Sequence, residues 1–119
     1  MENRLQGTWR LKTAERNSFL NWRSFSTGYE NGRFQFQDNG TALYTDNLVA
    51  MNGDWRMRQV NPNNDDENQR FALFIHLIDF NQQKTLSLDF DEIDYRGRNR
   101  FFGEYQSSGY RYRYEFVRD

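Results

Sequence analysis

The most constraining feature of the sequence is an alternation of period two, which is clearest near the carboxyl-terminal end. Four aromatic residues occupy every second position there: Tyr110, Tyr112, Tyr114 and Phe116. The positions between them are mostly charged: Arg111, Arg113, Glu115 and Val117. In an extended chain, alternate side chains point to opposite faces, so this pattern predicts an antiparallel strand with one buried and one solvated face.

The same alternation recurs along most of the chain. It covers residues 5–11, 33–37, 54–58 and 85–91. Turn signals separate these runs, at residues 38–40, 52–53, 81–83, 96–99 and 107–109. Asn39-Gly40 is expected to supply the pair of positive φ angles of a tight hairpin ahead of a strand at 41–45. These signals predict eight to nine short strands.

Two segments do not follow the alternation. Residues 61–68 hold the single proline, Pro62, among polar residues and are expected to form one long loop. Residues 17–25 are expected to form a short helix that Ser18 caps, with Phe19 and Trp22 one turn apart. No internal repeat is visible.

Composition narrows the class of protein further. The chain has 119 residues, room for one domain spanning 1–119, and 18% of them are aromatic, which indicates a packed aromatic core. There is no cysteine, which excludes disulfides and zinc–thiolate sites, and there is only one histidine. The formal net charge of −1 provides no strong field for nucleic acid or anionic lipid. No apolar run approaches the roughly 20 residues of a membrane-spanning helix.

These observations predict an all-β fold. Parallel strands need crossover helices, and the chain has no length to spare for them. An antiparallel sheet of this size has to close or double over to protect its edges. We therefore expect an up-and-down antiparallel β-barrel of about eight strands, with a β-sandwich as the alternative.

Several motifs, taken in order, resemble those of small bacterial lipocalin-like domains, which are calycin-type β-barrels. The motifs are Gly7-Thr8-Trp9, Phe34-Gln35-Phe36, Gly40-Thr41 with Tyr44, residues 53–57, Leu86-Ser87-Leu88 and the strand 112–118. The resemblance implies an eight-stranded barrel with a lumen for a small apolar ligand. It also implies that a basic residue of the last strand, here Arg118, stacks on Trp9 in a structural role. It favours a periplasmic or envelope-associated location.

The expected lumen carries the candidate ligand-binding residues. These are Tyr44, Trp55, His76, Phe90, Tyr110, Tyr112 and Tyr114. Tyrosine hydroxyls in an apolar pocket orient an amphipathic guest, whereas the same rings could instead fill the lumen as a solid core. His76 is either a ligand anchor or a hydrogen-bonded structural residue.

Other functions find less support in the sequence. The acidic run 89–94 lacks the spacing of a calcium loop and is interpreted as a solvated strand face, so we expect no metal and no cofactor. Residues 95–119 hold six arginines and three acidic residues. Their tyrosines and arginines fall on opposite faces, which argues against nucleic-acid binding and favours cross-strand ion pairs.

The expected function is therefore non-enzymatic binding of a small apolar or amphipathic molecule inside the barrel. No nucleophile–base pair supports an enzyme. The alternative is a sealed barrel that acts as a protein-interaction module through its arginine-rich outer face.

Overall fold

The computed structural model describes residues 4–18, 21–60 and 70–119. The alternating segments form strands throughout this part of the chain. The strands are β1 (Gly7–Ser18), β2 (Asn21–Ser24), β3 (Arg33–Phe36), β4 (Thr41–Thr45), β5 (Ala50–Gln59), β6 (Phe71–Asp79), β7 (Lys84–Tyr95), β8 (Arg100–Ser107) and β9 (Tyr110–Arg118).

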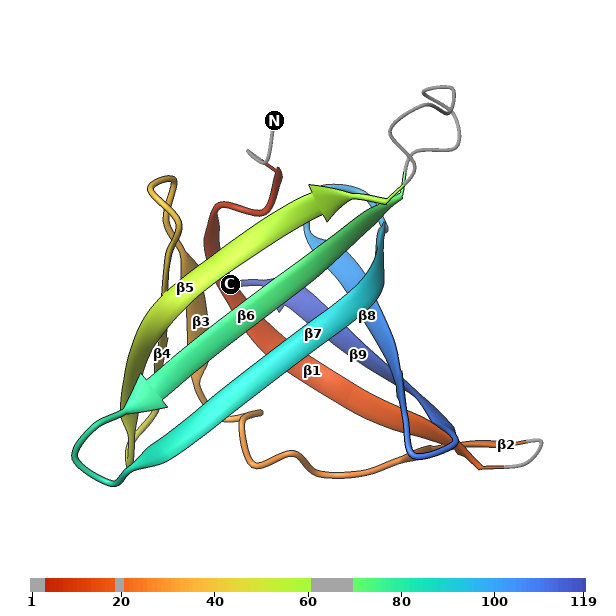
Figure 1. Ribbon diagram of the computed structural model, residues 1–119, viewed down its shortest axis with the longest axis horizontal. Helices are drawn as coiled ribbons and strands as arrows, with labels where there is room; N and C mark the ends of the chain where they lie inside the picture. Colours follow the sequence, from red (N-terminus) through yellow and green to blue (C-terminus); the bar gives the residue numbers. More distant parts are fainter. Residues whose placement is uncertain (1–3, 19–20, 61–69) are drawn as a thin grey trace.

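The sheet closes on itself. Strands β3 to β9 are antiparallel neighbours in sequence order, β1 pairs with β3, and β9 pairs with β1. This closure forms an eight-stranded barrel, and β2 is an extra strand that pairs with the far end of β1 (Figure 1). The prediction of an all-β antiparallel up-and-down barrel is confirmed.

Aromatic side chains fill much of the barrel interior. Trp9, Phe34 and Phe90 are fully buried, and the rings of Phe101 and Phe116 stack with their centroids 4.8 Å apart. Gly103 makes room for one of these rings, because a Cβ there would lie 2.7 Å from the ring of Phe90. The core is therefore aromatic, as composition predicts.

Two irregularities change which positions of a strand face inward. A shift in register between Leu11 and Thr13 of β1 lets both Leu11 and Ala14 face the core. A second shift occurs where β6 meets β7, so Phe90 and Ile93 are both buried. β-Bulges of this kind place an extra residue on one strand and let the sheet curve around the barrel.

The predicted turns at residues 38–40, 81–83, 96–99 and 107–109 are confirmed, with a change in geometry at the first. Residues 37–40 connect β3 to β4, and the Gly40 amide donates to the Gln37 carbonyl at 3.1 Å. Only Gly40 has positive φ, at 88°, so Asn39 does not contribute a second such residue. Ser108 and Gly109 do form a positive-φ pair, with φ angles of 55° and 86°, as a two-residue hairpin turn requires.

The predicted turn at Asn52-Gly53 is wrong. Both residues lie inside β5, where they pair with β4 on one side and β6 on the other. A Cβ at Gly53 would lie 1.9 Å from the His76 carbonyl oxygen. Glycine is therefore needed here for close approach of two strands, and it does not mark a chain reversal.

The predicted helix at residues 17–25 is also wrong. β1 continues to Ser18 and pairs antiparallel with β2, with Asn17 opposite Trp22. The Trp22 ring packs under the Arg113 guanidinium at 4.2 Å, so tertiary contact outweighs the local helix signal. Phe19, which was expected on the face of this helix, and the predicted loop at 61–68 lie outside the described residues.

Arg118 and Trp9 close one end of the barrel. The Arg118 guanidinium lies 4.2 Å from the Trp9 ring, as the resemblance implies. It also donates hydrogen bonds to the carbonyl oxygens of Arg4 and Gln6 at 2.7 and 2.8 Å. The Trp9 indole donates to the Leu5 carbonyl at 2.7 Å, so the two chain ends are tied together.

Within residues 4–18, 21–60 and 70–119, no helical segment has the length and apolar character that crossing a bilayer requires.

Candidate ligand-binding site

The other end of the barrel is covered by residues 25–32, which connect β2 to β3 and which we refer to as the strap. In Figure 1 the strap runs below the barrel strands. The backbone amide of Phe25 donates to the Ala14 carbonyl at 2.9 Å and anchors its first residue to β1. The rest of the strap lies outside the strand ladders, so its position depends on side-chain contacts.

Glu30 organises the strap through hydrogen bonds. Its carboxylate accepts from the Thr27 amide at 2.7 Å, from the Thr27 hydroxyl at 2.9 Å and from the Gly28 amide at 3.0 Å. The Tyr29 amide in turn donates to the Thr27 hydroxyl oxygen at 3.0 Å. Burial alone would raise the pKa of Glu30, but the hydrogen bonds from Thr27 and Gly28 lower it overall. The carboxylate is therefore charged at neutral pH and fixes the backbone conformation within the strap.

Aromatic rings fasten the strap to the barrel wall. Phe25 packs edge-to-face against Tyr112 and Tyr114, with centroids 5.8 and 6.2 Å apart. Tyr29 packs edge-to-face against Tyr44 at 5.2 Å. Such contacts contribute about 0.5–1.5 kcal/mol each beyond the area that they bury.

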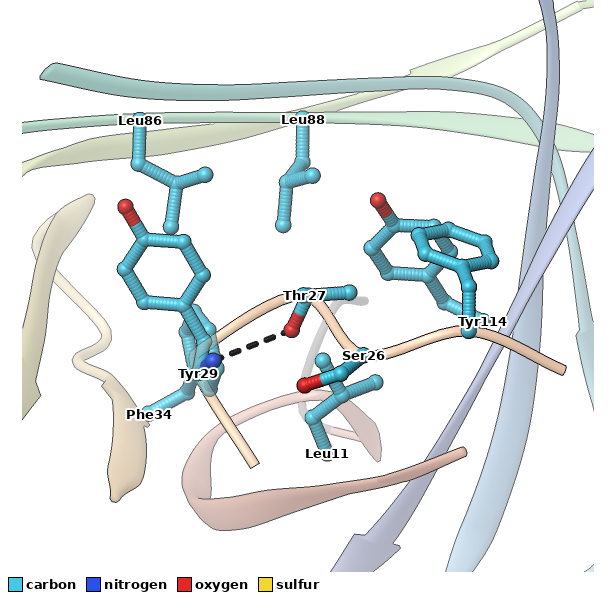
Figure 2. A pocket seen from close by; sticks show the side chains of 9 residues that line it. Leu11, Ser26, Thr27, Tyr29, Phe34, Leu86, Leu88 and Tyr114 are labelled. Atoms are coloured by element: carbon cyan, nitrogen blue, oxygen red, sulfur yellow. Dashed lines mark hydrogen bonds between the residues drawn. The ribbon is translucent and has the colours of Figure 1, made fainter. Parts of the chain in front are cut away.

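A cavity of about 260 Å³ lies between the strap and the barrel interior. Its apolar wall comes from β1, β3 and β7 through Leu11, Phe34, Leu86 and Leu88. Figure 2 shows Leu86 and Leu88 pointing into the cavity from one side, with the rings of Tyr29 and Tyr114 flanking it. We refer to this space as the inner cavity.

A few polar groups face the inner cavity. Ser26 and Thr27 line it from the strap, and Tyr114 lines it from β9. The Tyr114 hydroxyl lies 3.3 Å from the Tyr105 hydroxyl, and burial raises the Tyr114 pKa. That hydroxyl therefore stays protonated and can donate or accept a hydrogen bond. An apolar wall with a small number of hydroxyls is typical of a site that orients an amphipathic molecule.

A second pocket, of about 430 Å³, shares Thr27 and Tyr29 with the inner cavity. Asp46, Leu48, Gln82 and Lys84 are among the residues that line this outer pocket. The Asp46 carboxylate accepts a hydrogen bond from the Tyr44 hydroxyl at 2.7 Å, and that bond is the largest of the contributions that lower the Asp46 pKa. Strap residues thus line both pockets, of which the second carries more polar side chains.

The predicted lumen residues divide into three groups. Tyr114 lines the inner cavity, and Tyr112 and Tyr44 contact strap residues. Phe90 and Trp55 are buried in the core, where the Trp55 indole donates to the Gln37 carbonyl at 2.9 Å. Neither lines a pocket described here.

Tyr110 stands apart from the other lumen candidates. It begins β9 directly after the Ser108-Gly109 turn, and its half-buried ring stacks with the Arg16 guanidinium at 4.9 Å. The alternation places Tyr110 in phase with Tyr112. Because Tyr110 lies next to the hairpin turn, at the end of the barrel, its ring is not part of the packed core.

The predicted placement of His76 in the lumen is corrected. Leu73, Ile75 and Leu77 of β6 are buried, so the even-numbered positions that follow Leu73 point outward. The His76 side chain is 50% exposed and forms an ion pair with Asp89 of β7 at 2.9 Å. The sequence did not indicate which face of β6 is buried, because both faces of that segment carry large apolar residues.

Sequence reasoning missed the strap as the cover of the site. Phe25, Ser26, Thr27 and Tyr29 were not candidates, although all four line the inner cavity. One local signal was present, since Thr27 and Glu30 have the spacing of a capping box. Here the Glu30 carboxylate accepts from the Thr27 amide as in a capping box, but the Thr27 hydroxyl oxygen accepts from the Tyr29 amide, and no helix follows.

Most arginines of the carboxyl-terminal quarter pair with carboxylates, as predicted. The pairs are Arg96–Asp94, Arg100–Glu115, Arg111–Asp91, Arg111–Glu104 and Arg113–Glu15, at 3.0 to 3.3 Å. Among the residues that the structure describes, no group of three or more histidine or acidic side chains is placed to hold a metal ion.

Comparisons with protein-family models, with curated proteins and with solved structures found no match. The fold and the site geometry therefore carry the functional argument alone.

Proposed function

We propose that this protein is a non-enzymatic, lipocalin-like binding protein that holds one small amphipathic molecule in the inner cavity beneath the strap. The observation that carries the proposal is the cavity itself, an apolar space of about 260 Å³ that the barrel leaves unfilled beside buried aromatic rings. Concave, mostly apolar spaces with a few polar groups are the usual binding sites of small molecules.

The volume indicates the size of the guest. An apolar cavity of about 150 Å³ accommodates benzene, and drug-sized ligands occupy about 300–1,000 Å³. The inner cavity lies between these values. A single substituted ring or a short alkyl chain with one polar group fits this range.

The lining indicates the polarity of the guest. Leu11, Leu86 and Leu88 offer contact to an apolar body, and the Tyr114 hydroxyl offers a hydrogen bond to a polar group. The nearby carboxylate of Glu30 is already engaged by strap donors, which leaves it poorly suited to act as a general base. These features favour reversible binding over chemistry.

The experiment is calorimetric titration with a series of 4-alkylphenols and matching alkylbenzenes. We expect saturable one-to-one binding that peaks at one chain length, together with a melting temperature that rises with ligand concentration. Leu88→Phe fills the cavity and should abolish binding while the protein stays folded. Val60→Phe enlarges an exposed side chain outside both pockets and should leave binding unchanged. Equal binding by wild type and Leu88→Phe, or no binding to any member of the series, would contradict the proposal.

Tyr114→Phe tests the polar contact separately. Removing one hydrogen bond of about 0.5–1.5 kcal/mol should weaken phenol binding roughly 2- to 10-fold and leave alkylbenzene binding unchanged. Tyr95→Phe, outside both pockets, is the matched control. An equal loss for both ligand series would mean that Tyr114 acts through packing alone.

The alternative function, a sealed module that binds a protein partner through its arginine face, gains no support from the surface. Arg111 and Arg113 are held by Asp91, Glu104 and Glu15, which leaves their guanidinium groups less available to a partner.

A further inference from the structure

Exposed apolar side chains gather at the strap end of the barrel. Four large apolar side chains are exposed among the described residues, and three of them belong to the loops and strand end near the strap: Leu48, Ile78 and Phe80. Leu48 lies between β4 and β5, and Phe80 follows β6, in turns at the same corner of Figure 1. The fourth, Val60, follows β5 at the opposite end. We refer to Leu48, Ile78 and Phe80 as the apolar rim.

Each of the two loops is held by an aspartate that fixes its backbone. Asp79 is only 3% exposed, and its carboxylate accepts from the amides of Asn81 and Gln82 at 3.0 and 3.2 Å. This contact holds the turn with the Phe80 side chain 75% exposed. The loop geometry therefore keeps a large aromatic side chain in solvent, where it gains nothing for the stability of the isolated protein.

The second loop uses the same arrangement. The Asp46 carboxylate accepts from the amides of Leu48 and Val49, both at 2.8 Å, and Leu48 is 84% exposed. The Gln82 side-chain amide donates to the Leu48 carbonyl at 3.1 Å and ties the two loops together. Leu48 and Gln82 also line the outer pocket. The loops that carry Leu48 and Phe80 are thus joined to each other beside the outer pocket.

We propose that the apolar rim inserts into the interfacial layer of a lipid bilayer and docks the mouth of the barrel on the membrane surface. Side chains that project from loop tips suit a fluid surface, which closes around them without a matching shape. A fully exposed aromatic offers about 150–250 Å², so the rim offers on the order of 300–400 Å², well below the roughly 800 Å² per partner of a stable protein interface.

The charges around the rim favour a zwitterionic surface over an anionic one. Asp46 and Lys84 line the outer pocket beside Leu48, and Asp79 holds the Phe80 turn, so two acidic side chains and one basic side chain lie at the rim and give it no net attraction to an anionic surface. Lys84 can extend its ammonium group into the headgroup layer while its methylene stem stays apolar. Binding should therefore depend on apolar burial and change little with salt. This inference goes beyond the proposed function, because docking needs no ligand in the inner cavity.

The experiment is sedimentation of the ligand-free protein with sucrose-loaded phosphatidylcholine vesicles. The wild-type protein should sediment with the vesicles, and the double variant Leu48→Ser/Phe80→Ser should show an apparent partition coefficient at least tenfold lower. Val60→Ser removes an exposed apolar side chain at the other end and should match the wild type. Phe80→Leu keeps an apolar tip and should retain most of the binding.

Thermal melts followed by circular dichroism establish that each variant is folded. We expect all of them to fold, because the substituted side chains are exposed. Three results would overturn the proposal: no sedimentation of the wild type, equal sedimentation of the double variant, or binding only to anionic vesicles that vanishes in salt. A fourth would be light scattering that shows a wild-type dimer and a monomeric double variant without vesicle binding, since the rim would then join two copies of this chain. Calorimetry with phenols in the absence of vesicles tests the inner cavity independently.

Discussion

The two ends of the barrel are closed in different ways. At one end the Arg118 guanidinium carbon lies 4.2 Å from the centroid of the Trp9 ring. The Phe101 ring also packs against Trp9, with the two ring centroids 4.9 Å apart. These side chains come from strands β1, β8 and β9, whose register fixes where they meet. At the other end the strap crosses the mouth and leaves two pockets. The lumen is thus solid where strand side chains meet, and hollow where a connecting segment must cover it.

This difference predicts that the filled end dominates global stability. Trp9→Ala should lower the free energy of unfolding by about 3–5 kcal/mol, because it empties a fully buried site and removes the partner of Arg118. Urea denaturation followed by circular dichroism measures the loss. Trp22→Ala, a half-buried ring on the outer surface, should lose less than half as much. Equal losses would break the distinction between interior and surface rings.

Alanine substitutions at two buried leucines compare the stability contributed by the filled and the hollow parts of the lumen. Leu73→Ala should cost about 3–4 kcal/mol, and Leu88→Ala about 1–2 kcal/mol less, because Leu88 already borders the inner cavity and has fewer contacts to lose. Denaturant titration of both variants measures the difference. A larger loss at Leu88 would indicate that the strap side is packed as tightly as the rest.

Arg118→Lys should destabilise the protein by about 2 kcal/mol. The guanidinium both stacks on Trp9 and donates to three carbonyl oxygens, those of Arg4, Gln6 and Arg98. An ammonium keeps the charge but cannot reach all three carbonyls at once. Thermal unfolding compares this variant with Arg10→Lys on the same end of β1. A fully stable Arg118→Lys protein would show that charge alone seals this end.

The smallest expected effect is local and concerns the strap. The pKa of Glu30 lies below its ordinary value of 4.5, so its contribution is complete above that pH and is lost as the pH falls through the lowered value. Hydrogen exchange at the Thr27 and Gly28 amides should therefore accelerate relative to the barrel strands in acid.

Glu30→Gln provides the matching test at neutral pH. It replaces charge-assisted bonds with neutral ones and should accelerate exchange at these two amides about fivefold, with little change in global unfolding. The amides of β6 are the internal control. Unchanged exchange at Thr27 would mean that the aromatic contacts of Phe25 and Tyr29 alone hold the strap.

The alternation of side chains predicted the barrel well, because the direction of a side chain in a strand depends on its position along the chain. Tyr112, Tyr114 and Phe116 face inward as the period of two requires, and closure follows from the need to satisfy sheet edges. The stack of Arg118 on Trp9 followed from the resemblance and from the phase of β9.

Two of the errors share one cause, which is that local signals compete with strand pairing, and the third comes from an ambiguous periodicity. Asn52-Gly53 has turn chemistry, yet β4 and β6 draw it into a continuous strand. Residues 17–25 carry a helix signal, yet extension of β1 places Trp22 under Arg113. His76 lies in a run with apolar residues on both faces, so periodicity could not determine which face is inside.

By itself, the sequence determined the strands, most of their turns and the aromatic character of the interior, since these depend on residues a few positions apart. Only the tertiary structure decided where the lumen stays hollow. That outcome depends on how the strap crosses the mouth and on how much space the rings of different strands leave between them, and no local pattern encodes a volume. The same holds for the apolar rim, because the loops of Leu48 and Phe80 become neighbours only when β5 pairs with β6.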